Sequence, residues 1–552
     1  MRILGINAVF HDPAAALVVD GHIVAAAEEE RFSRRKHGKR AVPFSTWELP
    51  LAAARWCLDE AGLTPTDLDA VGYSYDPALM EGDTGQTEGL DQDWEYLRTM
   101  YARRAPRFLA TALPGLDPEA VRHVRHHVAH AASTALASPD ADTAVLVVDG
   151  RGERTSMLAG VYRDQKLDVL ASQPLPHSLG LLYESLTEHL GFARSSDEYK
   201  VMAMGSYGSP RFADQLRRSV YARGDGGFRT EPVDWADFAP ARTPTPPDQV
   251  SVPARPESHH ADLACSVQRV VEEVLLDLVA WLRDRVDADT LCLAGGVALN
   301  CVANTRIYAE SGFDRVWIQP AAGDAGTALG AALAIAAEAG DRIAPMPSAQ
   351  LGRGWTDEEI ADVLDRAAVR YERPADLAGA VGDALAANQL IGWFQGRSEF
   401  GPRALGGRSL LADPRSVANL ERLNDVKGRE QFRPVAPMVL ADRADEIFSR
   451  GPLPSPYMLF VHDVAPSWRD RIPAVTHVDG TARVQTVDGS QPLLHDTIAH
   501  FAARTGVPVL VNTSFNTAGR PMVDSPRDAL ECFGSSPIDV LVMGPYLIRQ
   551  MR

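Results

Sequence analysis

Residues 3–30 read ILGINAVFHDPAAALVVDGHIVAAAEEE, and this stretch decides the fold class. An apolar run is followed by a polar loop with His11 and Asp12, and then by two more apolar runs on either side of Asp20-Gly21. Asp-Gly between two apolar runs is a strong hairpin signal. The stretch therefore predicts a strand, a loop and a two-stranded hairpin.

The same plan returns further along the chain. TAVLVVDGRGERT (143–155) predicts a strand that ends in a polar, glycine-containing loop. SMLAGVYR (156–163) and LDVLASQ (167–173) predict a second hairpin, with its turn at 164–166. Two copies of one plan, each followed by helical segments, indicate a duplicated α/β domain with a cleft between its halves. The loops after the first strands would face that cleft.

Proline and glycine gather in residues 341–354, and Thr356-Asp357-Glu358-Glu359 then supplies a capping box for a new helix. We therefore expect one domain over 1–350 and a second α/β domain over 351–552. A proline-rich stretch at 240–256 reads as a surface loop inside the first domain. In the second domain we expect these elements: strands at 390–396 and 507–512 and a helix at 374–388.

Composition excludes several classes of protein. The chain has 552 residues, of which 45% are hydrophobic and 23% charged, as in ordinary globular proteins. Its formal net charge of −18 works against unassisted binding to nucleic acid or to an anionic membrane. The longest uncharged apolar run, 325–337, is shorter than the roughly 20 residues of a membrane helix. Five cysteines without a CxxC pair argue against a disulfide framework and a thiolate zinc site. We expect a cytoplasmic protein.

Four histidines lie close together in the sequence, and two of them have metal-binding spacing. They are His123, His126, His127 and His130. If 121–136 is helical, His126 and His130 lie one turn apart and can reach one metal ion, although a surface pair is the alternative. Asp149 closes the predicted strand AVLVVD, and Asp324 stands directly before an alanine-rich helical segment. Two imidazoles with carboxylate oxygens suit Fe(II), Mn(II) or Zn(II).

Two glycine turns point to a nucleotide. LCLAGGVALN (291–300) predicts a strand that breaks at Gly295-Gly296 into a helical start, where backbone N–H groups can approach a phosphate. A tight strand-to-helix turn is the alternative. Together with GDAGTALG (323–330), the segment resembles the adenosine-binding turns of the actin, sugar-kinase and heat-shock ATPase superfamily.

A basic segment in the second domain points to phosphate. Between Arg397 and Arg433 the chain carries eight basic and five acidic residues, a net +3 in a chain of −18. Guanidinium groups among glycines suit bidentate phosphate binding, and a solvated charged surface is the alternative. The polar run 512–516 after a predicted strand adds uncharged donors, although by itself it is most often a turn.

These motifs together resemble one family, the NodU/CmcH-type O-carbamoyltransferases. The resemblance spans essentially the whole chain, and its blocks include GINAVFHDPAAAL, EEERFSRRKHG, HHVAH, VVDGRGE, GGVALN, GDAGTALG, EFGPRALGGRS, KGREQFRP and NTSFN. It implies an actin/heat-shock-ATPase-like (ASKHA) amino-terminal domain, similar to the tRNA threonylcarbamoyl-transfer ATPase, and a YrdC-like α/β carboxyl-terminal domain.

The resemblance also implies two reactions. Carbamoyl phosphate and ATP, with Mg(II), would give carbamoyl-adenylate in the second domain. The first domain would pass the carbamoyl group to a hydroxyl of a natural product, as in antibiotic biosynthesis. The implied metal is Fe(II) or another divalent ion, the partners are small molecules rather than nucleic acid or membrane, and a homodimer is compatible with the sequence.

Carried over by position, the resemblance implies a role for each site residue. The metal ligands would be His126, His130 and Asp324, with Asp149 beside them. His11 would assist deprotonation of the acceptor hydroxyl, because a neutral imidazole near pH 7 suits a general base. The remaining assignments are Lys36 for the charge of the adenylate; Gly295, Gly296 and Asn300 for its nucleotide; Arg403, Lys427, Arg433 and Arg483 for phosphate and carbamate; and Asn512 and Ser514 near the nucleotide.

Two departures and two alternatives remain at this stage. Relatives often show a KVMGLA-type run where this chain has KVMAM from Lys200, and Arg151 adds a cation beside the expected metal. A tRNA threonylcarbamoyl-type modification enzyme is disfavoured by the acidic balance. A non-catalytic nucleotide-dependent chaperone or sensor leaves the basic segment unexplained. The identity of the acceptor is not readable from the motifs.

Overall fold

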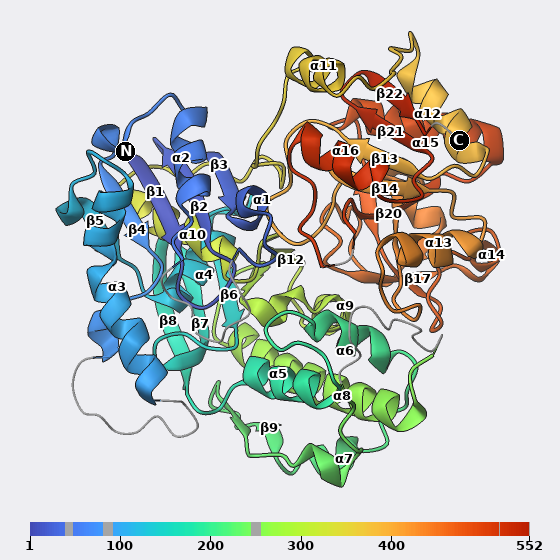
Figure 1. Ribbon diagram of the computed structural model, residues 1–552. Helices are drawn as coiled ribbons and strands as arrows, with labels where there is room; N and C mark the ends of the chain where they lie inside the picture. Colours follow the sequence, from blue (N-terminus) through green and yellow to red (C-terminus); the bar gives the residue numbers. More distant parts are fainter. Residues whose placement is uncertain (39–47, 81–91, 244–254, 518, 551–552) are drawn as a thin grey trace. The chain divides into compact units, whose positions relative to one another are not determined.

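The structure is a computed structural model that describes residues 1–38, 48–80, 92–243, 255–517 and 519–550 (Figure 1). The chain divides into two units. Unit 1 consists of Met1–Pro244 and Asp262–Leu351, and unit 2 of Thr245–Ala261 and Gly352–Arg552. Most of the loop expected at 240–256 lies outside the described residues.

Two five-stranded sheets repeat one topology in unit 1. The first has the order β3-β2-β1-β4-β5, and the second, read in the same sense, has the order β8-β7-β6-β11-β12. In each sheet the first strand of the copy pairs antiparallel with the second strand and parallel with the fourth. The duplicated α/β plan expected from the two copies of strand, loop and hairpin is confirmed.

Both predicted hairpins are present. The strands of the two sheets are β1 Arg2–Asn7, β2 Ala14–Val19, β3 His22–Glu28, β4 Ala70–Tyr73, β5 Val121–His123, β6 Thr143–Val148, β7 Thr155–Arg163, β8 Lys166–Pro174, β11 Thr290–Ala294 and β12 Arg315–Ile318. Asp20-Gly21 and Asp164-Gln165 close the hairpins with positive φ at both residues, as type I′ turns require. The second turn is thus one residue shorter than expected, because Lys166 already belongs to β8.

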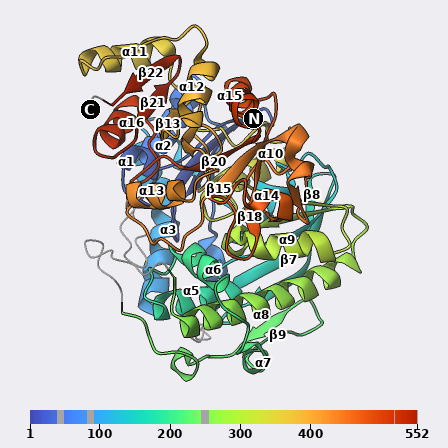
Figure 2. The same ribbon diagram turned by 90° about the vertical axis from the view of Figure 1, so that its right-hand side faces the viewer.

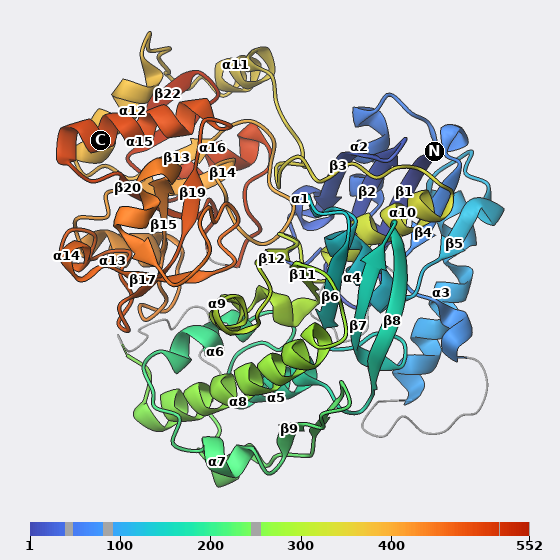
Figure 3. The same ribbon diagram turned by 180° about the vertical axis from the view of Figure 1, so that it is seen from behind.

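Two buried helices lie between the sheets. Helix α4, His126–Ala135, packs against β6, β7 and β11, whereas α10, Ala325–Glu338, packs against β1, β2 and β4. The two helices also pack against each other, as Figures 1 and 3 show. The long apolar run of the sequence is therefore a helix of the core. Among the described helices, none has both the length and the apolar character to cross a membrane.

Glycines allow these layers to approach closely. A Cβ atom on Gly5 of β1 would lie 1.8 Å from the carbonyl oxygen of Ala328 in α10. A Cβ atom on Gly330 would lie 1.7 Å from the carbonyl oxygen of Ala129 in α4. Because both distances are far below van der Waals contact, only glycine permits this packing of backbone on backbone.

Alternation along β1 gives the first sheet its two faces. Gly5 faces α10, while Leu4 and Ile6 join a core with α2 and α3 on the other face. The remaining elements of this part of the chain are α1 Glu30–Ser33, α2 Leu51–Glu60, α3 Gln92–Ala112, α5 Leu179–His189, α6 Glu198–Gly205, α7 Ala213–Leu216, β9 Val220–Ala222, β10 Phe228–Thr230, α8 Ser258–Arg283 and α9 Cys301–Glu310.

The helix expected over 121–136 is wrong at its start. Val121–His123 forms β5, which pairs in parallel with β4, and α4 begins only at His126. The backbone of Arg125 is extended, with φ −53° and ψ 135°, and so separates the strand from the helix. His126 and His130 still lie one turn apart within α4.

Unit 2 is built on a seven-stranded mixed sheet with the order β19-β15-β20-β14-β13-β21-β22, and a small sheet has the order β16-β17-β18. The strands are β13 Ile391–Phe394, β14 Arg408–Ala412, β15 Ala436–Leu440, β16 Phe448–Ser449, β17 Val461–Val464, β18 Thr481–Arg483, β19 Gln485–Val487, β20 Val509–Ser514, β21 Val540–Met543 and β22 Tyr546–Arg549. Figure 2 faces this unit, with its helices around the strands.

The helices of unit 2 are α11 Asp357–Arg366, α12 Leu377–Ala386, α13 Ala418–Val426, α14 Pro466–Arg469, α15 Pro492–Thr505 and α16 Pro526–Gly534. The capping box at Thr356 is present and begins α11. The expected strands and the expected helix are also present as β13, β20 and α12, with shorter or shifted ends. The predicted α/β class of this part of the chain is confirmed.

The close approach at Gly330 gives a stability prediction. Gly330→Ala should lower the melting temperature by several degrees, because the added methyl group overlaps the backbone of α4 and overpacking costs about 1–3 kcal/mol or more. The control is Gly534→Ala in α16, where an added Cβ meets no atom within 4 Å. Thermal unfolding followed by circular dichroism checks both variants, and equal melting temperatures would contradict the packing described above.

Candidate functional site

Four predicted metal ligands meet where the central helices begin. His126 is the first residue of α4, and His130 follows one turn later. Asp149 comes directly after β6, and Asp324 stands at the N-cap of α10. All four side chains are buried, and their ligand atoms lie within 4.8 Å of one another. The structure thus brings together residues that are spread over nearly 200 positions of the chain.

The distances between these atoms fit a shared ion. His126 Nε2 lies 3.5 Å from an oxygen of Asp149 and 3.5 Å from an oxygen of Asp324. His130 Nε2 lies 3.8 Å and 3.6 Å from the same two carboxylates. His126 Nδ1 is 3.1 Å from the carbonyl oxygen of Ser74, to which it donates. In the neutral form of this imidazole, Nε2 therefore has a lone pair for a metal.

The donor atoms of this cluster also lack other partners. His126 Nε2, His130 Nε2 and both carboxylate oxygens of Asp324 are buried and make no hydrogen bond to the described chain. Buried polar atoms normally have a partner, so such a group requires an explanation. Two imidazole nitrogens with carboxylate oxygens are the ligand set of Fe(II), Mn(II) or Zn(II). The residues therefore fit a divalent cation.

The charges of the four clustered side chains also favour binding of a positive charge. Burial opposes charge on His126, but Asp324 and Asp149 outweigh it and raise its pKa well above the ordinary value. Burial likewise opposes charge on the two carboxyl groups, yet the neighbouring histidines lower the pKa of Asp149 and of Asp324. The carboxylates thus attract a positive charge, which either protons or a cation can supply.

Two supporting residues were not among the predicted ligands. His127 Nδ1 is 2.8 Å from Thr155 Oγ1, and its Nε2 is 4.0 Å from Asp149. Burial, followed by the charge of His126, lowers the pKa of His127 to about 3. Glu153 accepts from the backbone N–H of His126 at 2.9 Å and thus holds the first turn of α4. Its place four residues after Asp149, in the polar loop DGRGE, was the available signal.

His11 lies beside the cluster, in the loop after β1. Its Nε2 is 3.7 Å from Asp324, and its Nδ1 is 3.0 Å from Asp12. Unlike the buried ligands, its side chain is 32% exposed. Burial lowers the pKa of His11, but Asp324 and Asp12 outweigh that effect and raise it to about 10. This differs from the neutral imidazole expected near pH 7, and the two carboxylates are the reason.

Lys36 and the glycine turn lie in the same unit. Lys36 is half-buried in the loop after α1. Gly295 has φ +91°, and a Cβ there would lie 2.2 Å from the carbonyl oxygen of Val148. Gly296 donates its N–H to Asp149 at 2.8 Å. The turn therefore holds the end of β11 against the end of β6, next to the cluster.

Asn300 has a structural task in addition to its predicted role. Its side-chain oxygen accepts from the N–H of Ala303 at 3.1 Å and so caps α9. Its amide also exchanges two hydrogen bonds with Gln268, at 2.9 and 3.1 Å. Contact between Asn300 and a nucleotide stays a prediction.

The two cations of unsettled role are both paired with carboxylates. Arg151 donates twice to Glu95, at 2.7 Å each, and lies 5.2 Å from the ring centre of Phe10. Lys200 lies 3.1 Å from Asp197. In this structure both side chains thus form ion pairs with carboxylates of unit 1.

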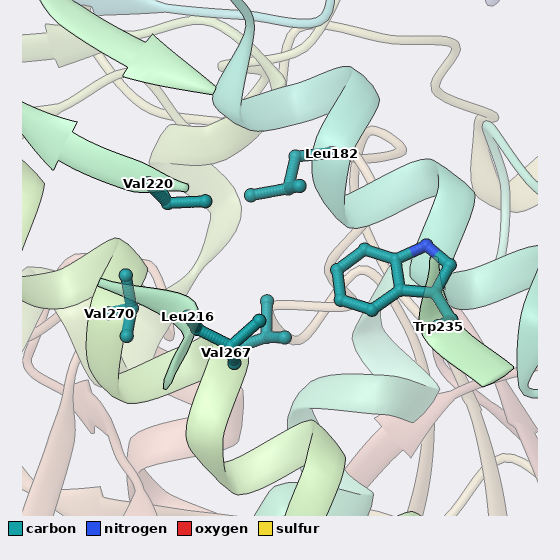
Figure 4. Close-up of a pocket in the computed structure, with 6 residues that line it drawn as sticks. All are labelled: Leu182, Leu216, Val220, Trp235, Val267 and Val270. Atoms are coloured by element: carbon teal, nitrogen blue, oxygen red, sulfur yellow. The ribbon is translucent and has the colours of Figure 1, made fainter. Parts of the chain in front are cut away.

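An apolar hollow elsewhere in unit 1 is not the site. Figure 4 shows the side chains that line it. They are Leu182, Leu216, Val220, Trp235, Val267 and Val270. None of them is a predicted site residue, and the space between them has no room for a ligand. The hollow is a packing seam between α5, α7 and α8.

Unit 2 joins several predicted phosphate residues through hydrogen bonds. Lys427, the C-cap residue of α13, donates to Ser514 Oγ at 2.8 Å and to its carbonyl oxygen at 2.7 Å. Asn512 donates to the carbonyl oxygen of Ala404 at 2.9 Å and to Gln485 at 2.7 Å. The bond to Ala404 holds the loop that contains Arg403 against β20, and the bonds of Lys427 hold the end of α13 against the end of the same strand.

The other two arginines of the predicted clamp lie on neighbouring segments. Arg483 ends β18, two residues before Gln485, and its buried Nε has no hydrogen-bond partner among the described residues. Arg433 is half-buried on the loop after α13, where its guanidinium is 3.4 Å from Glu430. Gln485, which the motifs did not single out, links the segment of Arg483 to Asn512.

Part of the basic segment serves the fold. Arg408 is buried, donates to the carbonyl oxygens of Gln395, Gly396 and Gly407, and lies 3.8 Å from the ring centre of Phe394. A solvated surface is therefore the wrong interpretation for this arginine.

Glu399 is a further residue that the motifs did not single out. It accepts from the N–H groups of Leu405, Gly407 and Arg408 and so shapes the glycine loop.

Comparisons with known proteins find two family descriptions that match different parts of the chain. The family described as Carbamoyltransferase N-terminus matches residues 2–333, and Carbamoyltransferase C-terminus matches residues 382–550. The nodulation protein NolNO of Sinorhizobium fredii is 36% identical over 99% of this chain and 80% of its own length. "Uncharacterized protein sll1178" of Synechocystis is 38% identical over 99% of this chain and 96% of its own length.

A solved structure, HypF of T. kodakarensis, covers 62% of this chain and 49% of that chain at 15% identity. Its TM-score of 0.34 is too low to support any argument. The sequence matches are different in kind, because one family description covers more than half of the chain and the relatives align with nearly all of it. The chain belongs to the carbamoyltransferase family, and it is a carbamoyltransferase.

Proposed function

We propose that the protein is an ATP-dependent O-carbamoyltransferase that makes carbamoyl-adenylate from carbamoyl phosphate and ATP and carbamoylates a hydroxyl of a natural product. The observation that supports it most is the buried cluster of His126, His130, Asp149 and Asp324 with His11 beside it. A half-exposed imidazole next to a buried cation site is an arrangement suited to activating a hydroxyl.

The first reaction belongs to unit 2. Water releases phosphate from carbamoyl phosphate and leaves carbamate, whose oxygen attacks the α-phosphorus of ATP, so that pyrophosphate departs and carbamoyl-adenylate forms. Arg403, Lys427, Arg433 and Arg483 bind the phosphate and carbamate oxygens, because fixed cations stabilise the charge that develops on them. Asn512 and Ser514 lie at the same strand end as uncharged polar groups.

The second reaction belongs to unit 1. His11 takes the proton of the acceptor hydroxyl, the acceptor oxygen attacks the carbamoyl carbon, and the bond to AMP breaks. Lys36 faces the negative charge of the adenylate, and Gly295, Gly296 and Asn300 lie near its nucleotide. Summed over both steps, carbamoyl phosphate, ATP, water and the alcohol give phosphate, pyrophosphate, AMP and a carbamate ester.

His126, His130 and Asp324, with Asp149, would hold a divalent cation, and the family resemblance favours Fe(II). Such an ion, when bound, supplies Lewis acidity that polarises a carbonyl or phosphoryl oxygen. With Asp324 engaged as a ligand, its carboxylate would raise the pKa of His11 less, and the imidazole would come closer to the range of a general base.

The overall reaction is tested by product analysis. The protein is incubated with carbamoyl phosphate, ATP and hydroxylated metabolites, among them macrolides, aminoglycosides, ansamycins, β-lactams and sugars. Mass spectrometry should find one product with an added carbamoyl group, formed together with AMP. ATP turnover that does not depend on carbamoyl phosphate would contradict the proposal and favour a chaperone or sensor.

Arg433→Ala should abolish the first half-reaction. We expect pyrophosphate release to fall at least about 100-fold, because a fixed charge on the reacting phosphate is lost. The control is Arg527→Ala, whose side chain is 82% exposed in unit 2 and which should behave as the wild type. Normal pyrophosphate release by Arg433→Ala would remove this arginine from the site.

His126→Ala and His11→Asn should spare pyrophosphate release and block carbamoyl transfer. Loss of a general base typically lowers the rate about 10²–10⁴-fold. His126→Ala should in addition lower the amount of metal bound per protein molecule, as measured by elemental mass spectrometry. His495→Ala, at a half-exposed histidine next to Asp496 in unit 2, is the control. If both variants fail already at pyrophosphate release, the assignment of two separate reactions is wrong.

A further inference from the structure

We propose that Asp12 and His37 form a positioning pair that holds the imidazole of His11 in one tautomer and one orientation for carbamoyl transfer. The inference rests on the proposed function for the role of His11. It assigns a task to two side chains that neither bind the predicted cation nor touch the reacting atoms.

The carboxylate of Asp12 bridges two imidazoles. One oxygen lies 3.0 Å from His11 Nδ1, and the other lies 2.9 Å from His37 Nδ1. Because an ionised carboxylate only accepts, both Nδ1 atoms must carry the hydrogen. In the neutral form of His11 the lone pair is then on Nε2, the nitrogen that lies 3.7 Å from Asp324. This is the nitrogen that faces the metal cluster and an incoming hydroxyl.

His37 is itself held from two other segments. Its Nε2 is 2.7 Å from Ser196 Oγ, on the connection between α5 and α6. Its backbone N–H donates to Glu30 of α1 at 2.7 Å. Asn7 at the end of β1 donates to the carbonyl oxygen of Asp12 at 2.9 Å. The orientation of Asp12 is therefore set by contacts with three parts of unit 1.

Backbone geometry gives a second, independent observation. Asp12, His37 and Ser195 are non-glycine residues with φ of +48°, +62° and +56°. Side chains disfavour this left-handed region, and such conformations persist where the surroundings impose them, often at functional sites. Asp12 and His37 belong to the chain of hydrogen bonds that ends at His11, and Ser195 directly precedes Ser196, the residue at its other end.

The same side chains could instead bind a second cation, since ligand atoms of Asp12, Glu30 and His37 lie within 4.8 Å of one another. The observed contacts favour the positioning pair. Both ring nitrogens of His37 already have hydrogen-bond partners, and both oxygens of Asp12 are used by imidazoles. Binding of an additional equivalent of metal that is lost in a His37 variant would overturn the proposal.

The test compares His37→Asn with His37→Leu. The amide nitrogen of asparagine can replace Nδ1 as the donor to Asp12, whereas leucine fills a similar volume without a polar atom. With an acceptor identified by product analysis, His37→Leu should lower kcat for carbamoyl transfer about 10- to 100-fold, the usual cost of removing a partner that orients a histidine. His37→Asn should stay within a few-fold of the wild type, and KM for the acceptor should change little in both.

A measurement that needs no acceptor decides the orientation directly. In protein labelled with ¹⁵N-histidine, His11 should show a downfield Nδ1–H signal, assigned by its loss in His11→Asn. This signal should persist in His37→Asn and disappear in His37→Leu. His22→Leu, at an exposed histidine of β3, is the control and should change neither the signal nor the activity.

Each outcome has a distinct meaning. Equal losses in both His37 variants, or no loss in either, would overturn the positioning role. Full transfer activity in His11→Asn would instead remove His11 as the base, which is a failure of the proposed function. Melting curves of all variants separate these results from a failure to fold.

Discussion

The close approach of α4 and α10 at Gly330 is the constraint on which the site of unit 1 depends. With no side chain at that position, the backbone of α10 lies directly against the carbonyl oxygen of Ala129. Because both helices start at the same side of this contact, His126 at the start of α4 meets Asp324 at the start of α10. A larger residue at the crossing would move the two helices apart and separate the ligand atoms with them.

Local signals in the sequence were sufficient to predict most helices and strands, but not which distant segments each of them contacts. Asp20-Gly21 and the glycine-containing strand ends predicted the hairpins and the duplication, and the spacing of His126 and His130 predicted two ligands on one helix face. The strand Val121–His123 was missed because it exists only by pairing with β4, whose residues are some fifty positions earlier. The contact between His37 and Ser196, which are 159 positions apart, also depends on the tertiary fold. No periodic pattern in the sequence predicts such a contact.

The charge pattern of residues 397–433 located a basic segment, but it did not reveal which groups each arginine contacts. An excess of arginine among glycines predicted a phosphate-binding segment, which stays a prediction, yet Arg408 donates to three backbone carbonyl groups. A guanidinium satisfies carbonyl oxygens and phosphate oxygens with the same donors. Only burial and neighbours tell the two uses apart, and these depend on the folded loop that Glu399 shapes through its three backbone contacts.

The duplication also explains why the site is asymmetric. Strands β5 and β12 hold equivalent places in the two sheets, and they lead to α4 and α10, each of which packs on the sheet of the other copy. The first copy contributes the imidazoles of His126 and His130, whereas the second contributes the carboxylates of Asp149 and Asp324. Neither copy alone holds a complete ligand set. A cation bound between them would therefore stabilise the packing of the two copies by mass action, since this packing brings the four side chains together.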